Sequence, residues 1–104
     1  MNLQRAHLIS SIQILFKHDE ELLYFFFNHK IPELRLGVAE LLNEARNLDR
    51  AEYILIQAAI DFWNGAGGFR LGDALNVLDE DSFLALVKAM LYFREIKMWE
   101  TAEC

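Results

Sequence analysis

Two segments of this chain are apolar on every face of any helix that they could form. One is residues 22–27, Leu-Leu-Tyr-Phe-Phe-Phe, and the other is residues 53–63, in which only Gln57 and Asp61 are not hydrophobic. A helix at a protein surface shows a single apolar stripe, so a helix that is apolar all round has to be covered on all sides. A chain of 104 residues has little material to cover two such helices. Either the helices pack very compactly or a second chain covers part of their surface.

The composition fits one soluble domain with an excess of apolar residues. Ala, Val, Ile, Leu, Met, Phe, Trp, Cys and Gly together make up 58 of the 104 residues, and charged residues make up 25%. In soluble domains the same apolar set is about 45–50% and charged residues are about 25%. The length is that of one domain, so we expect residues 1–104 to form a single helical domain without a linker. The apolar excess favours a built-in interface.

The spacing of the apolar residues predicts an all-α fold, because no stretch shows the alternation of a β-strand. We expect a compact single-domain bundle of five or six helices with short loops. The predicted helices span residues 3–17, 19–28, 32–45, 50–63, 71–78 and 80–96, and residues 99–104 are expected to fray unless they dock. Alternatively, residues 3–28 form one long helix. The eleven-residue spacing of His7, His18 and His29 fits that alternative.

Several short motifs mark the ends of these helices. Asp19, Asp49 and Asp79 stand where N-caps are expected, and Glu52 follows Asp49 by the three residues of a capping box. Gly65 suits the C-terminal end of the helix over 50–63. Within the helix over 80–96, the residues at the spacing of one helical face are Phe83, Leu84, Val87, Met90 and Leu91.

The net charge of −6 disfavours two classes of partner. An acidic chain gains nothing from the release of counterions by a phosphate backbone, so we expect no direct binding to nucleic acid. Anionic membrane surfaces are disfavoured for the same electrostatic reason. The longest uncharged stretch near the middle, residues 53–60, is far shorter than the about 20 residues of a membrane span.

The cysteine content and the N-terminal sequence predict a cytoplasmic protein. Cys104 is the only cysteine, so the chain cannot form an internal disulfide and nothing indicates an oxidising compartment. The N-terminal residues lack the uncharged apolar core of a signal peptide.

We find no arrangement of residues that is typical of an enzyme, a metal site or a cofactor site. The histidines would lie about 16 Å apart along one helix, and no HExxH motif is present. Ser10, Ser11 and Ser82 do not lie in a nucleophile elbow. We therefore expect no catalytic residue, no metal ligand and no cofactor.

The glycine-rich segment 65–72 has two interpretations. It does not match GxGxxG or a P-loop, so a nucleotide site is rejected. In the structural interpretation glycine ends the preceding helix, Phe69 and Leu71 fill the core, and Asp73 caps the next helix or pairs with Arg70. In the functional interpretation the segment is a recognition loop, because tryptophan and arginine are enriched at binding hot spots.

Asp61 is conspicuous because it interrupts an otherwise apolar helix. A buried carboxylate without a partner is costly. Asp61 is therefore expected to face a gap, to pair with a basic group such as Arg70, or to lie at an interface. A pocket between the helices over 50–63 and 71–78 would have Asp61, Asn64, Arg70 and Asp73 as its polar groups.

These observations favour a small acidic helical protein-protein interaction module, a regulator, adaptor or inhibitor that binds a protein partner or forms a homodimer. The expected contact residues are Phe25, Phe26, Phe27, Trp63, Asn64, Arg70 and Asp73. Two alternatives stay open. One is a small-ligand-binding protein or enzyme that uses the pocket near Asp61 and Arg70, and the other is an acidic decoy of a nucleic-acid-binding protein.

Overall fold

A computed structural model of the chain confirms the all-α fold. It describes residues 3–28, 31 and 33–102, with side chains described for 7–28, 31 and 33–94. The six helices are α1 (Leu3–Leu15), α2 (Glu20–Phe26), α3 (Val38–Ala45), α4 (Arg50–Asn64), α5 (Leu71–Val77) and α6 (Glu80–Ala102). No helix in this part of the chain is both long and apolar enough to cross a bilayer.

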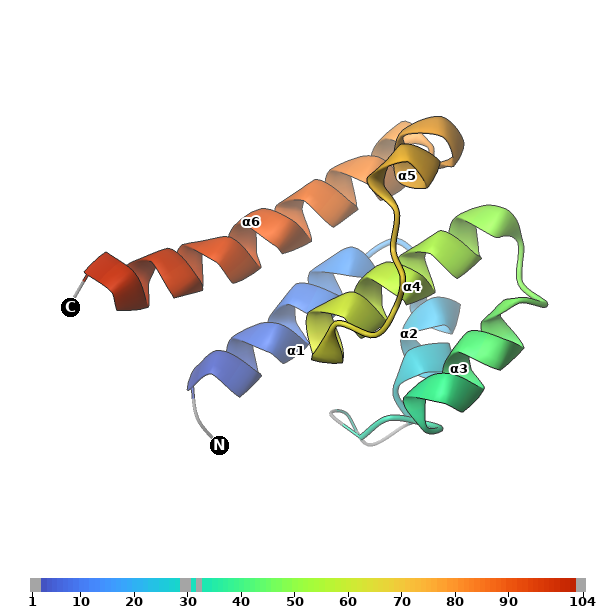
Figure 1. Cartoon of the computed structure of the whole chain (residues 1–104), viewed down its shortest axis with the longest axis horizontal. Helices are drawn as coiled ribbons and strands as arrows, with labels where there is room; N and C mark the ends of the chain where they lie inside the picture. Colours follow the sequence, from blue (N-terminus) through green and yellow to red (C-terminus); the bar gives the residue numbers. More distant parts are fainter. Residues whose placement is uncertain (1–2, 29–30, 32, 103–104) are drawn as a thin grey trace.

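The centre of the bundle is α4, which contacts α1, α2, α3 and α5 (Figure 1). The residues of α4 that are buried are Ile54, Leu55, Ile56, Ala58, Ala59 and Ile60. The apolar segment over 53–63 is therefore covered mainly by helices of its own chain. The long α6 packs along α1, and Figure 1 shows it at one edge of the molecule.

Residues 3–28 form two helices, so the alternative of one long helix is wrong. The chain leaves α1 through a turn in which the Asp19 N–H donates to the carbonyl oxygen of Phe16 at 3.0 Å. The Asp19 side chain then caps α2 by accepting from the Leu22 N–H at 3.1 Å. This turn places His18 outside α1, so His7 and His18 do not share one helix, and His29 lies outside the described residues.

The third helix begins later than predicted. It starts at Val38, whereas the sequence predicts a start at Pro32, which lies outside the described residues. Phe27 and Leu34 instead form an isolated antiparallel bridge, in which the Asn28 N–H donates to the Glu33 carbonyl at 2.8 Å and the Arg35 N–H to the Phe26 carbonyl at 3.0 Å. Residues 33–35 thus bond the end of α2 instead of starting a helix.

The predicted caps of α4 and α6 are confirmed, but α6 is longer than predicted. Asp49 and Glu52 form the predicted capping box, with bonds of 2.8 Å and 3.3 Å. Gly65, with φ of 78°, ends α4 in the left-handed conformation. The Asp79 side chain accepts from the Ser82 N–H at 2.8 Å at the start of α6. This helix extends to Ala102, six residues past its predicted end, and residues 103–104 lie outside the described residues.

The inward face of α6 differs from the predicted one. The buried residues are Ala85, Leu86 and Ala89, whereas Leu84 and Leu91 are 46% and 56% exposed. Small alanines let α6 approach its neighbours closely, and the leucines on the other side of the helix are left facing outward. The sequence offers two apolar stripes on this helix, and packing against α1 covers the one with the alanines.

Candidate functional site

The predicted contact residues at the end of α2 are largely in the core. Phe26 and Phe27 have no exposed surface, and their rings meet edge-on with centroids 4.9 Å apart. Trp63 reaches both rings from α4 at 6.1 Å. Phe26 and Phe27 therefore stabilise the fold and are not accessible to a partner of the folded chain, whereas Phe25 and Trp63 are half-buried.

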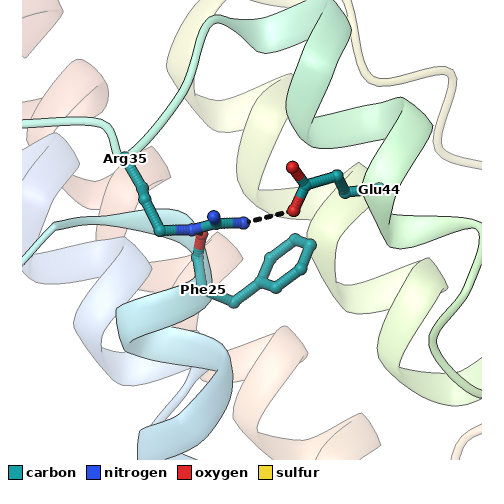
Figure 2. Close-up of polar contacts among 3 residues, drawn as sticks. All are labelled: Phe25, Arg35 and Glu44. Carbon is teal, nitrogen blue, oxygen red and sulfur yellow. Dashed lines mark hydrogen bonds and ion pairs between the residues drawn. The ribbon is translucent and has the colours of Figure 1, made fainter.

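Arg35 joins α2 to α3, as Figure 2 shows. Its Nε donates to the carbonyl oxygen of Phe25 at 2.9 Å, and its terminal nitrogen pairs with the Glu44 carboxylate at 2.8 Å. The guanidinium carbon also lies 4.8 Å from the centre of the Phe25 ring. The sequence did not single out Arg35, because its partners Phe25 and Glu44 are ten and nine residues away and only the fold brings them together.

Asp61 organises the glycine-rich loop. Its two carboxylate oxygens accept the N–H groups of Gly67 at 2.7 Å and Phe69 at 2.9 Å. Its predicted partner Arg70 makes no ion pair with it in the part of the chain that the structure describes. Hydrogen bonds from backbone N–H groups of the loop offset the cost of removing the half-buried Asp61 carboxylate from water.

Two more side chains of α4 support the same loop. Gln57 donates through Nε2 to the Gly68 carbonyl at 3.3 Å, and Asn64 accepts from the Ala66 N–H at 3.0 Å. Asn64 is thus a turn residue at the end of α4. Phe69 packs against the core as predicted, but Leu71, which was predicted to do the same, is 54% exposed.

Arg70 and Asp73 do not form the predicted pair. Arg70 is exposed and precedes α5 without a side-chain capping bond. Asp73 does not cap α5 and lies 3.5 Å from the Arg50 guanidinium at the start of α4. Both predictions for Asp73 are therefore wrong. Arg70 holds the N-cap position of α5, and Arg50, distant in sequence, lies beside the Asp73 carboxylate.

A cavity of about 320 Å³ lies between α4, the glycine-rich loop and α6. Its lining residues are Ala58, Asp61, Phe62, Phe69, Leu86, Met90 and Phe93. The predicted pocket lay between α4 and α5, and its other polar residues, Asn64, Arg70 and Asp73, are not among those that line this cavity. Because the Asp61 oxygens are bonded to the loop, the cavity suits an apolar group.

A second cavity, of about 340 Å³, lies where the starts of α2, α4 and α6 converge. Its acidic residues include the three capping aspartates, Asp19, Asp49 and Asp79. Burial raises the pKa of Glu52, and the nearby charge of Asp49 adds to the effect, whereas hydrogen bonds from Ser82 lower the pKa of Asp79. The described residues contain no group of three or more ligand side chains placed to hold a metal ion.

The large apolar side chains that are exposed all belong to α5 and α6 in the described part of the chain. They are Leu71, Leu75, Leu84, Met90, Leu91 and Tyr92, and we call them the α5–α6 apolar surface. Leu75 is the most exposed, at 62%. Leu71 was predicted to fill the core, and Leu84, Met90 and Leu91 were predicted to share one helical face. An apolar spacing does not determine which face of a helix its neighbours cover.

Comparison of the chain with protein-family models, with curated proteins and with solved structures found no match in any of the three.

Proposed function

We propose that this chain is a small acidic protein-protein interaction module of the cytoplasm that acts as a regulator, adaptor or inhibitor. The α5–α6 apolar surface carries the proposal. Leu71 and Leu75 are exposed one turn apart on α5, and Leu84 and Leu91 are exposed two turns apart on one side of α6. Exposed apolar residues that share a helix face mark a contact site when they form a contiguous patch. The net charge of −6 keeps such a protein soluble.

The proposed docking residues differ from those predicted from the sequence. Phe26 and Phe27 are replaced by the leucines of α5 and α6, because only exposed side chains reach a partner. Arg70 and Asp73 remain part of the proposal, since they lie beside Leu71 in the sequence at the start of α5. A polar rim around an apolar centre is the usual composition of an interface.

A triple variant tests the proposal. Leu75→Ser, Leu84→Ser and Leu91→Ser remove three exposed side chains, and substitutions at exposed positions usually change stability little, by about 0.5 kcal/mol each. The control carries Ala39→Ser and Asn43→Ser, two exposed positions on α3. The measurement is chemical cross-linking in host lysate. We expect the wild type and the control to form adducts with a second copy of the chain or with another protein, and the triple variant to form none.

Two outcomes would contradict this function. One is a wild-type chain that forms no adduct, and the other is a triple variant that keeps all of them while its circular dichroism is unchanged. Adducts that vanish at high salt yet survive the triple substitution would favour the acidic decoy, because screening weakens contacts between exposed charges far more than apolar contacts.

The cavity between α4 and α6 supports a second candidate, a small-ligand-binding protein. Three phenylalanines and Met90 line it, and its volume of about 320 Å³ is at the low end for ligand sites. The test is the binding of a fluorescent naphthalene sulfonate probe to the wild type and to Met90→Trp, which would fill the cavity. Equal binding by both proteins, or none by the wild type, would exclude this candidate.

A further inference from the structure

The outer side of α6 carries a stripe with the spacing of a coiled-coil seam. Leu84, Lys88 and Leu91 follow one another at intervals of four and three residues, and all three are exposed. Their counterparts on the inner side, Leu86 and Ala89, are buried. Intervals of three and four that alternate along a helix are typical of helices that pair side by side.

The length and position of α6 suit such pairing. It has 23 residues, which corresponds to about 35 Å and to three heptads. Figure 1 shows it along one edge of the molecule, with α1 on its inner side and α5 beside only its first turns. A partner helix could therefore lie along most of its outer side.

Among the α6 side chains that the structure describes, which end at residue 94, the acidic ones come before the basic ones. Glu80 and Asp81 lie in the first turn of the helix, and Lys88 and Arg94 follow in its middle. Two such helices in parallel would place acid beside acid and base beside base. In an antiparallel arrangement Glu80 of each helix can lie opposite Arg94 of the other, which is the complementary choice.

From this stripe and this charge pattern we propose that the occupant of the outer face of α6 is a second copy of this chain, with the two α6 helices antiparallel. The proposal rests on the function proposed above and specifies its partner. A two-fold axis level with Val87 places Glu80 of each copy level with Arg94 of the other. It also brings Leu84 of each copy next to Leu91 of the other. Their positions along the helix axis differ by one helical rise, about 1.5 Å.

Lys88 lies in the middle of this seam, and a two-fold axis level with Val87 brings it near Lys88 of the other copy, so the two positive charges weaken the pairing. Its aliphatic stem can pack between the leucines while its ammonium group reaches the edge of the seam. Asp81, three residues before Leu84, is a second charged residue at this spacing. Polar residues at seam positions select the pairing arrangement at a cost in stability. We therefore expect a dimer that dissociates on dilution, strengthened by Lys88→Leu.

A charge swap in the full-length chain tests both the second copy and its orientation. We expect Arg94→Glu, or Glu80→Arg alone, to weaken dimerisation about tenfold in Kd, because two symmetric pairs each change from attraction to repulsion. The double variant, Glu80→Arg with Arg94→Glu, restores both pairs and should regain the affinity of the wild type. The measurement is sedimentation equilibrium at low and physiological salt, with circular dichroism to confirm that each variant is folded.

Arg46→Glu is the matched control, because it makes the same change of charge at an exposed arginine outside α6. It should leave the Kd unchanged. A monomeric wild type would overturn the proposal, and so would a double variant that stays as weak as its singles, since only antiparallel pairing predicts the recovery. In either case the proposed interaction function stands if the wild type forms adducts with another protein and the triple leucine variant does not.

Discussion

Gly67 lies against the backbone of Gln57, one of the residues on the last two turns of α4. A Cβ at Gly67 would overlap the carbonyl oxygen of Gln57 and would lie 3.0 Å from the backbone nitrogen of Asp61. Backbone atoms inside a helix cannot move aside without breaking its hydrogen bonds. Residue 67 is therefore restricted to glycine, and the loop folds back onto α4 because it has one there.

This contact predicts opposite effects for two glycine substitutions. Gly67→Ala should destabilise the chain by about 3 kcal/mol or more, because overpacked positions that cannot relax carry costs of that size. Gly72→Ala, in α5 with nothing within 4 Å of its Cβ position, should stabilise it by about 0.5–1 kcal/mol through the better helix propensity of alanine. Urea denaturation of both variants measures the two effects, and similar midpoints would contradict the geometry of the loop.

Asp61 provides the second prediction about this loop. Asp61→Ala removes the acceptor of two backbone N–H groups, and we expect a loss of about 2–3 kcal/mol, the cost of a hydrogen bond to a charged group. Asp61→Asn keeps one acceptor oxygen and should lose about half as much.

The matched control for Asp61 is Asp73→Ala. Among the described residues its carboxylate takes part only in an exposed ion pair of 3.5 Å with Arg50, so the loss should be below about 1 kcal/mol. All three free energies of unfolding come from the same denaturation series. A larger loss for Asp73→Ala than for Asp61→Ala would show that the loop does not depend on the Asp61 carboxylate.

The structure explains which features the sequence could and could not predict. The caps at Asp19, Asp49 and Asp79 were predictable because a cap needs only a side chain and a backbone N–H three residues away. The bridge between Phe27 and Leu34 was not, since it pairs residues seven positions apart that no helical or strand pattern links. The same limit applies to Leu84 and Leu91, whose exposure depends on which face of α6 lies against α1.

Arg35 should be sensitive to the shape of its head group as well as to its charge. Arg35→Ala removes the bonds to Phe25 and Glu44 (Figure 2), and we expect a loss of about 1–2 kcal/mol. Arg35→Lys keeps the charge but has no second nitrogen to reach both acceptors, so it should recover less than half of that loss. Thermal denaturation measures the stability of both variants, and Glu44→Gln reports the contribution of the ion pair alone. If Arg35→Lys were as stable as the wild type, the contribution of Arg35 would come from its charge and not from the shape of its head group.

Glu52 and Asp79 should give stability changes of opposite sign with pH. Burial and the charge of Asp49 raise the pKa of Glu52 above its ordinary value of 4.5. The folded state then binds this proton more tightly than the unfolded state, so the contribution of Glu52 is favourable at low pH and is lost as pH rises through its folded pKa. Hydrogen bonds from Ser82 lower the pKa of Asp79, so its contribution is present at neutral pH and is lost as pH falls through its folded pKa.

Two neutral variants separate these contributions. Glu52→Gln keeps the acceptor of the capping box and should be more stable than the wild type at neutral pH, with the difference fading toward pH about 3. Asp79→Asn should be less stable than the wild type at neutral pH, again with a difference that fades in acid. Denaturation at both pH values measures the two, and a difference of the same sign for both variants at neutral pH would refute the assignment.

Ser11 is the fully buried polar residue of the described core, and its hydroxyl oxygen makes no hydrogen bond within the described part of the chain. A buried hydroxyl loses its hydration on folding and is costly unless a partner replaces it. We therefore expect Ser11→Ala to stabilise the chain by about 1 kcal/mol, because alanine fits the same space without the polar atom. Ile12→Ala, at the next buried position of α1, should instead cost about 2–5 kcal/mol through the cavity it leaves. If both variants are destabilised in calorimetry, the Ser11 hydroxyl has a partner that lowers its cost, and the interior of α1 is less apolar than its packing indicates.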